Sequence, residues 1–89
     1  MTTPDSLLSD IDKAIAMTDE RLTAAPRDML KSIRTQLSFM RDTIAAGRAP
    51  TVDEKNRLTI GVIAAREFED SDPAYADALA DASFAFKKR

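Results

Sequence analysis

Two groups of charged residues are the parts of this chain whose types and spacing could do chemistry. Six carboxylates and no basic residue lie between Glu67 and Asp81, whereas seven basic and four acidic residues lie between Arg27 and Arg57. A run of carboxylates attracts a cation or a basic protein surface, and a row of arginines can hold phosphate. Both groups could therefore bind a charged partner.

The composition removes most of the side chains used for catalysis and metal binding. The sequence has no histidine and no cysteine, so the commonest general base, the commonest metal ligand and any thiolate site are missing. Neither of the two glycines stands in the strand-to-helix setting of a phosphate-binding loop. We therefore expect no catalytic residue, no metal and no cofactor, and we predict that the protein is not an enzyme.

The length of 89 residues predicts one domain, residues 1–89, with a single modest core and no cofactor cleft between domains. The amino terminus has no basic segment leading into an apolar run, and no apolar stretch approaches the roughly 20 residues of a membrane span. Without cysteine, nothing requires an oxidising compartment. We expect a cytoplasmic protein with no membrane contact.

Helical periodicity and capping residues mark four helices. The first starts with Thr3 as cap and Pro4 inside, and ends before Pro26; the second runs from about residue 27 or 28 to Ala46, with Gly47 in the left-handed position. A capping box formed by Thr51 and Glu54 opens the third, which ends near residue 69. Asp72 or Ser71 as cap, with Pro73 first inside, starts the fourth. With short connections and no period-two stretch, we predict an all-α, compact four-helix antiparallel bundle.

The third predicted helix carries an uncharged stretch from Leu58 to Ala65 that is apolar on both sides. We expect it to be the most enclosed helix, or to bury one side and offer the other to a partner. Gly61 in its middle costs about 1 kcal/mol relative to alanine, which suggests a close approach at that point. One side holds Leu58, Gly61, Val62, Ala65 and Phe68, and the other Ile60, Ile63 and Ala64.

The second predicted helix carries an arginine at every seventh position along one flank, namely Arg27, Arg34, Arg41 and Arg48, joined by Lys31. This flank could be a phosphate track, or a solvated surface whose guanidinium groups meet nearby carboxylates. The net charge of −2 and the absence of interleaved aromatics favour the second interpretation. Phe39 lies off the apolar seam of this helix and either packs against the fourth helix or is exposed for a partner.

The position of Glu67 and Glu69 at the end of the third predicted helix is unfavourable. A helix carboxyl terminus disfavours negative charge by roughly a few tenths of a kcal/mol per residue. Carboxylates kept where local electrostatics oppose them point to a positively charged partner outside the chain.

The stretch Arg57 to Ala64, followed by Arg66 to Pro73, resembles the immunity protein of a type VI secretion effector, a toxin that hydrolyses NAD and NADP. The likeness continues in Thr3-Pro4, Ile11 to Ala14, Gln36-Leu37, Met40-Arg41, Ala78-Leu79 and Asp81-Ala82, and is weaker from Gly47 to Glu54. The resemblance implies an all-helical inhibitor without chemistry of its own. Such a protein binds its cognate toxin and covers the nucleotide-binding cleft.

Under this resemblance, an acidic projection would enter the pocket for the dinucleotide pyrophosphate, and apolar side chains would supply most of the affinity. The predicted toxin-binding residues are Glu67, Glu69, Asp70 and Asp72, with Phe39, Ile60, Ile63, Phe68 and Tyr75. Phe68 and Tyr75 are equally candidates for the core. One alternative is a helical regulatory or nucleic-acid-binding module that uses the arginine flank. Another, compatible with toxin binding, is a homo-oligomer that buries Ile60 and Ile63 against its own copy.

Overall fold

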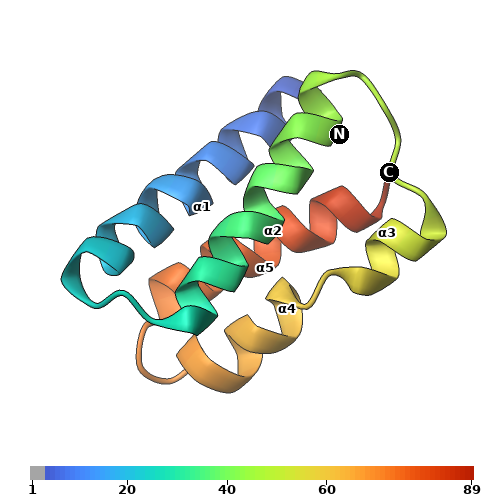
Figure 1. Cartoon of the computed structure of the whole chain (residues 1–89). Coiled ribbons are helices and arrows are strands. Elements are labelled where there is room, and N and C mark those ends of the chain that lie inside the picture. The colour runs from blue at the N-terminus through green and yellow to red at the C-terminus, as the bar shows by residue number, and fades with distance from the viewer. Residues whose placement is uncertain (1–3) are drawn as a thin grey trace.

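The computed structural model describes residues 4–89, with side chains from residue 6 onward, so the expected Thr3 cap lies outside it. The elements are α1 (Pro4–Ala24), α2 (Asp28–Ala45), α3 (Val52–Arg57), α4 (Ile60–Ile63), the π-helix η1 (Ala64–Phe68) and α5 (Pro73–Lys87) (Figure 1). This part of the chain contains no strand. The all-α prediction is confirmed. No helix within residues 4–89 has the length and apolar character that crossing a bilayer would need.

Helices α1 and α2 form an antiparallel pair whose facing stripes are buried (Figure 1). Two ion pairs join their outer edges: Asp12 with Arg41 and Asp19 with Arg34, each with nitrogen and oxygen 2.8 Å apart. The partners are seven residues apart on each helix and run in opposite order, as antiparallel packing requires. The buried residues are Leu7, Ile11, Ala14 and Thr18 of α1, with Leu30, Ile33, Leu37, Met40, Thr43 and Ile44 of α2.

The most enclosed helix is α5. It packs against α1 and against α4 and η1. By contrast, α3 contributes no buried residue, so the expectation that the third helix would be the most enclosed is wrong. Small side chains explain the difference, because alanine lets the backbones of neighbouring helices approach α5 closely. The buried residues of α5 are Tyr75, Ala76, Ala78, Leu79, Ala82, Ser83 and Phe86.

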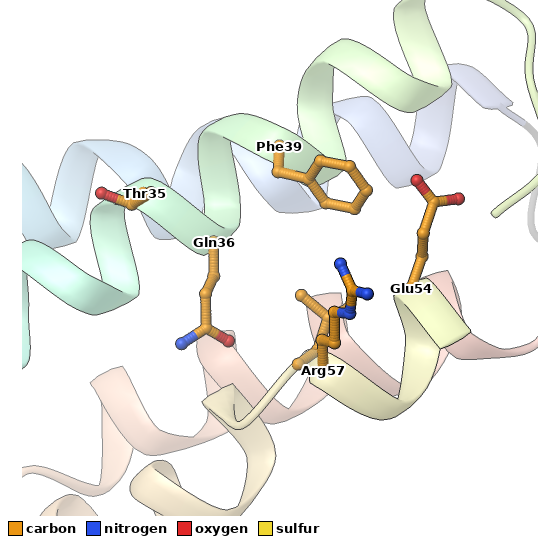
Figure 2. Close-up of a pocket in the computed structure, with 6 residues that line it drawn as sticks. Thr35, Gln36, Phe39, Glu54 and Arg57 are labelled. Atoms are coloured by element: carbon orange, nitrogen blue, oxygen red, sulfur yellow. The ribbon is translucent and has the colours of Figure 1, made fainter. Parts of the chain in front are cut away.

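The predicted third helix is broken at Leu58 and Thr59 into α3 and α4. Its capping box is present, since the Thr51 hydroxyl accepts from the Glu54 amide and the Glu54 carboxylate accepts from the Thr51 amide. Gln36 reaches from α2 to the break (Figure 2), where its oxygen accepts from the Thr59 amide at 2.8 Å and its nitrogen donates to the Thr59 hydroxyl at 3.0 Å. At the break the Leu58 side chain is buried in the core, whereas no residue of α3 is buried.

The segment formed by α4 and η1 is buried on one side only. Ile60 and Ala64 face the core, whereas Val62 is exposed. The prediction that Ile60 and Val62 lie on opposite sides of the helix is therefore correct. At Gly61, an added Cβ would lie 3.6 Å from the Ser83 hydroxyl oxygen, an ordinary contact, so the approach does not require glycine. Gly47 does adopt the left-handed conformation, with φ of 72°.

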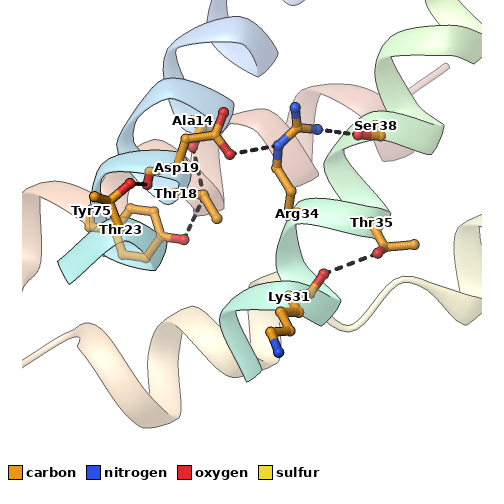
Figure 3. A network of polar contacts seen from close by, with 9 residues as sticks. All are labelled: Ala14, Thr18, Asp19, Thr23, Lys31, Arg34, Thr35, Ser38 and Tyr75. Atoms are coloured by element: carbon orange, nitrogen blue, oxygen red, sulfur yellow. Dashed lines mark hydrogen bonds and ion pairs between the residues drawn. The ribbon is translucent and has the colours of Figure 1, made fainter. Parts of the chain in front are cut away.

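A buried hydrogen bond joins α1 to α5 (Figure 3). The Thr18 hydroxyl donates to the Ala14 carbonyl at 2.8 Å, and the Tyr75 hydroxyl oxygen lies 2.6 Å from the Thr18 oxygen. Because the Thr18 hydrogen already points to Ala14, Tyr75 is the donor to Thr18. A phenol is protonated at neutral pH, and burial raises the pKa of Tyr75 further above its usual value, so the hydroxyl carries the hydrogen that it donates.

Removing the Tyr75 hydroxyl tests how much its hydrogen bond to Thr18 stabilises the fold. We expect Tyr75→Phe to lower the free energy of unfolding by about 1 kcal/mol, because the ring still packs but the hydrogen bond is lost. Urea unfolding followed by circular dichroism measures the change. Thr35→Val removes an exposed hydroxyl bonded within α2 and serves as the control, with a change below about 0.5 kcal/mol. Equal stability of Tyr75→Phe and the unmodified protein would contradict the assignment.

Candidate functional site

Three neighbouring carboxylates form an exposed acidic surface at the end of η1. Glu67, Glu69 and Asp70 all point to solvent, and none of them forms an ion pair with another described residue. Their side chains therefore keep their charge available for a partner. We call Glu67, Glu69 and Asp70 the acidic surface.

The fourth predicted carboxylate, Asp72, has a different role. Its Oδ2 atom lies 2.8 Å from Nε of Arg21, and the same guanidinium donates to the Met17 carbonyl at 2.9 Å. The hydrogen bond from Arg21 lowers the pKa of Asp72. Asp72 stands at the start of α5 without a capping hydrogen bond of good geometry, although the nearby Tyr75 amide also lowers its pKa. Its carboxylate mainly ties the turn to α1.

An aromatic pair holds the same turn from inside. The Phe68 ring meets the Tyr75 ring edge-on, with centroids 4.9 Å apart and planes at 70°. The Arg21 guanidinium lies 4.3 Å from the centre of the Tyr75 ring. Phe68 is half-buried and Tyr75 is fully buried. The acidic surface is therefore presented on a turn that is packed in place by rings and by a cation.

The apolar residues that were predicted to contact the toxin differ in how exposed they are. Ile60 and Tyr75 have no exposed surface, so the free protein does not offer either side chain to a partner. Ile63 and Phe68 are half-buried and pack at the edge of the core. The homo-oligomer hypothesis that buries Ile60 and Ile63 against a second copy loses its main contact, because Ile60 is already covered within the chain.

Phe39 lies on another part of the molecule. Its ring packs edge-on against Phe86 of α5, with centroids 6.4 Å apart, so it meets the fourth predicted helix while remaining half-buried. The exposed part of the ring lines a hollow of about 240 Å³ (Figure 2). This hollow is lined by residues of α2 and α3, and α3 and the turn after η1 adjoin opposite ends of the segment formed by α4 and η1 (Figure 1). The other lining residues are Thr35, Gln36, Glu54, Arg57 and Leu58.

The arginine flank of α2 is largely neutralised by carboxylates. Arg34 and Arg41 pair with α1, and Arg34 also donates to Ser38 (Figure 3). Arg48 binds both oxygens of Glu54, at 2.8 and 3.0 Å. The interpretation of a solvated flank that meets acidic side chains is confirmed for these three arginines. A phosphate track would need guanidinium groups free of such partners.

The sequence analysis did not select two exposed apolar residues, Val62 and Phe84. Their exposed fractions are 57% and 65%, and both line a hollow between α4 and α5. A signal was present, because Phe84 lies off the buried stripe of α5 and Val62 lies opposite Ile60. Within residues 6–89 no group of histidine, cysteine or acidic side chains is arranged to hold a metal ion.

The pairing of Asp72 with Arg21 makes stability depend on pH. Since the folded pKa of Asp72 lies below the unfolded value of about 3.9, the pair stabilises the fold above that pH and stops doing so as pH falls through the folded pKa. We expect Asp72→Asn to be less stable than the unmodified protein at pH 7, with a difference that shrinks below pH about 4. Urea unfolding between pH 7 and 2.5 measures it.

A second carboxylate with a lowered pKa, Glu54, does not disturb the comparison of Asp72→Asn with the unmodified protein. Arg48 lowers the pKa of Glu54 to about 2, and this carboxylate titrates alike in both proteins, so the difference between them isolates Asp72. A difference that stays constant across the whole pH range would contradict the role given to the ion pair.

Comparison with known proteins identifies relatives over almost the whole chain. A family model described as Tsi6 matches residues 6–88. Immune protein Tsi6 of Pseudomonas aeruginosa is 36% identical over 75 residues, which are 83% of this chain and 79% of that protein. The structure of Tse6 in complex with Tsi6 matches with a TM-score of 0.82 and 32% identity, over 96% of this chain and 87% of the matched chain. The structure of Tsi6 from Pseudomonas aeruginosa matches with a TM-score of 0.79 and 31% identity, over 99% and 98%. The chain therefore belongs to the Tsi6 family.

Proposed function

We propose that this protein is an immunity protein that binds and inhibits a cognate toxin similar to Tse6. The observation that carries the proposal is the match, over nearly the full chain, to a structure of Tse6 in complex with Tsi6. The resemblance of the central stretch to immunity proteins of type VI secretion effectors supports an NAD(P)+ glycohydrolase as the target. The protein acts in the cytoplasm of the producing cell, where incoming toxin would consume the nucleotide pool.

The mechanism that fits this chain is occlusion without catalysis. A pocket for a dinucleotide pyrophosphate presents donors and positive potential. The acidic surface, Glu67, Glu69 and Asp70, carries charge of the opposite sign on a braced turn and would compete with the substrate for that pocket. Complementary charge of this kind mainly raises the association rate and selects the partner.

The remaining predicted residues divide into four roles under this proposal. Ile63 and Phe68 contribute the apolar border of the acidic surface, and Phe39 would serve a more distant contact. Asp72 positions the turn through Arg21. Ile60 and Tyr75 support the surface from below. A standard interface buries about 800 Å² per partner, roughly a seventh of the 5405 Å² surface of this chain, so the toxin would cover the turn and its surroundings together.

Co-expression tests the function directly. We expect a cell that produces the toxin encoded beside this protein to lose NAD and stop growing, and co-expression of the immunity protein to restore both. The purified pair should form a complex at micromolar concentration and suppress NAD(P)+ hydrolysis. A toxin that stays fully active with this protein in molar excess would rule the function out.

Charge reversal tests the acidic surface. We expect the triple change Glu67→Lys, Glu69→Lys and Asp70→Lys to slow toxin association by about tenfold or more, because steering charge is reversed. The matched control reverses Asp10, Asp42 and Asp53, which gives the same net charge from exposed carboxylates elsewhere. Stopped-flow or biolayer kinetics at two salt concentrations measure both variants. Equal effects of the two triple changes would assign the result to net charge and not to this surface.

A further inference from the structure

Two hollows lie between α5 and the segment formed by α4 and η1. One has a volume of about 440 Å³ and is lined by Val62 and Phe84. The other has a volume of about 210 Å³ and reaches Glu69 at the end of η1. Gly61 and Ala80 line both, so the two hollows adjoin and form one groove. We call this the α4–α5 groove.

The groove has a shape suited to receiving a side chain. Its floor consists of small residues, among them Gly61, Ala64 and Ala80, so no large group of this chain fills it. Val62 and Phe84 stand at one end with 57% and 65% of their surfaces exposed. The other large exposed apolar residue of the described chain, Val52, lies on α3 and lines none of this groove. Exposed aromatic and aliphatic side chains beside a vacant floor are typical of binding anchors.

The rim of the groove is acidic. Glu69, Asp77 and Asp81 line its length and are exposed, and within the described residues they form no ion pair. One cation, Lys87, also lines the far end and donates to the Leu58 carbonyl at 3.5 Å, and Lys88 lies 4.3 Å from the centre of the Phe84 ring. The three carboxylates still outnumber the one lysine that lines the groove. A complementary occupant therefore carries basic residues around an apolar one.

We propose that the α4–α5 groove binds a basic segment of the cognate toxin, with an apolar toxin side chain seated on Ala80 and Gly61 between Val62 and Phe84. This inference rests on the proposed function and adds a more exposed apolar contact beside the acidic surface, whose own apolar border, Ile63 and Phe68, is half-buried. Glu69 belongs both to the acidic surface and to the groove, so one toxin face can cover them together. A second copy of this chain fits less well, because it presents the same three carboxylates along its own groove.

Two variants with opposite effects on groove volume test the inference. Phe84→Ala removes the anchor, and Ala80→Leu fills the floor where the two hollows meet. Both positions are exposed, so the helical circular dichroism and the melting temperature should stay close to those of the unmodified protein. We expect each to weaken toxin binding at least about 30-fold in calorimetry, the size of a hot-spot loss. Val52→Ala is the matched control, with affinity within about twofold.

The charge of the rim is tested separately. We expect Asp77→Lys with Asp81→Lys to slow toxin association and to reduce its dependence on salt, because fewer charges attract the basic segment. The acidic surface itself is unchanged in this variant. Unaltered association would contradict a basic occupant.

Three outcomes distinguish the possible failures. If the unmodified protein does not bind the toxin, the proposed function fails and the groove inference fails with it. If it binds, and Phe84→Ala and Ala80→Leu bind equally well, only the groove inference is overturned. If the free protein has twice its 9.8 kDa mass in sedimentation, and Phe84→Ala returns it to a monomer with unchanged toxin affinity, a second copy occupies the groove and the inference is overturned.

Discussion

The buried ring of Tyr75 is the contact on which the arrangement of the rest depends. Its hydroxyl bonds to Thr18 of α1, its face carries the Arg21 guanidinium, and it forms a T-shaped pair with the Phe68 ring of η1. One side chain of α5 thereby joins its own helix to the preceding η1 and to α1, which is distant in sequence. Arg21 extends this contact to Asp72, so the turn that carries the acidic surface is braced by the same cluster that closes the core. A preorganised turn loses less conformational entropy when a partner binds it.

The two sides of helix α5 have different roles, one in the core and one in the α4–α5 groove. Its buried side packs Tyr75, Leu79 and Phe86 into the core, and its exposed side forms one wall of the α4–α5 groove with Ala80 and Phe84. Alanine serves both sides, because a small side chain permits close helix packing inside and leaves a vacant floor outside. A chain of 89 residues has little surface to spare, so using one helix for stability and for recognition is economical in residues.

The carboxylates of the described chain differ in whether an arginine pairs with them. Asp12 and Asp19 of α1 and the capping Glu54 meet arginines, whereas Glu67, Glu69 and Asp70 meet no cation of the described chain. The small net charge of −2 conceals this separation. Exposed pairs contribute roughly 0.2–1 kcal/mol each to stability, so the pairs on α1 and α2 mainly set register. The unpaired carboxylates act at longer range on an approaching partner.

Local signals in the sequence were sufficient for most helix starts and ends and for much of the core. Pro4 and Pro73 mark helix starts, Thr51 and Glu54 form the capping box, and Gly47 supplies the left-handed position after α2. Each of these acts within a few residues of its own position, so no knowledge of the fold is needed to interpret it. The seam of α2 and the buried stripe of α5 follow from helical periodicity in the same way.

Other features were decided only by contacts between distant residues. Gln36 holds the break at Thr59 from 23 residues away, and no local signal between Thr51 and Phe68 indicates that the helix stops there. Periodicity shows that Ile60 and Val62 lie on different sides, but it cannot choose the inner side when both are apolar. Packing against α5 made that choice. It also buried Tyr75 and left Val62 and Phe84 exposed, because only the neighbouring helices determine which apolar surface is covered.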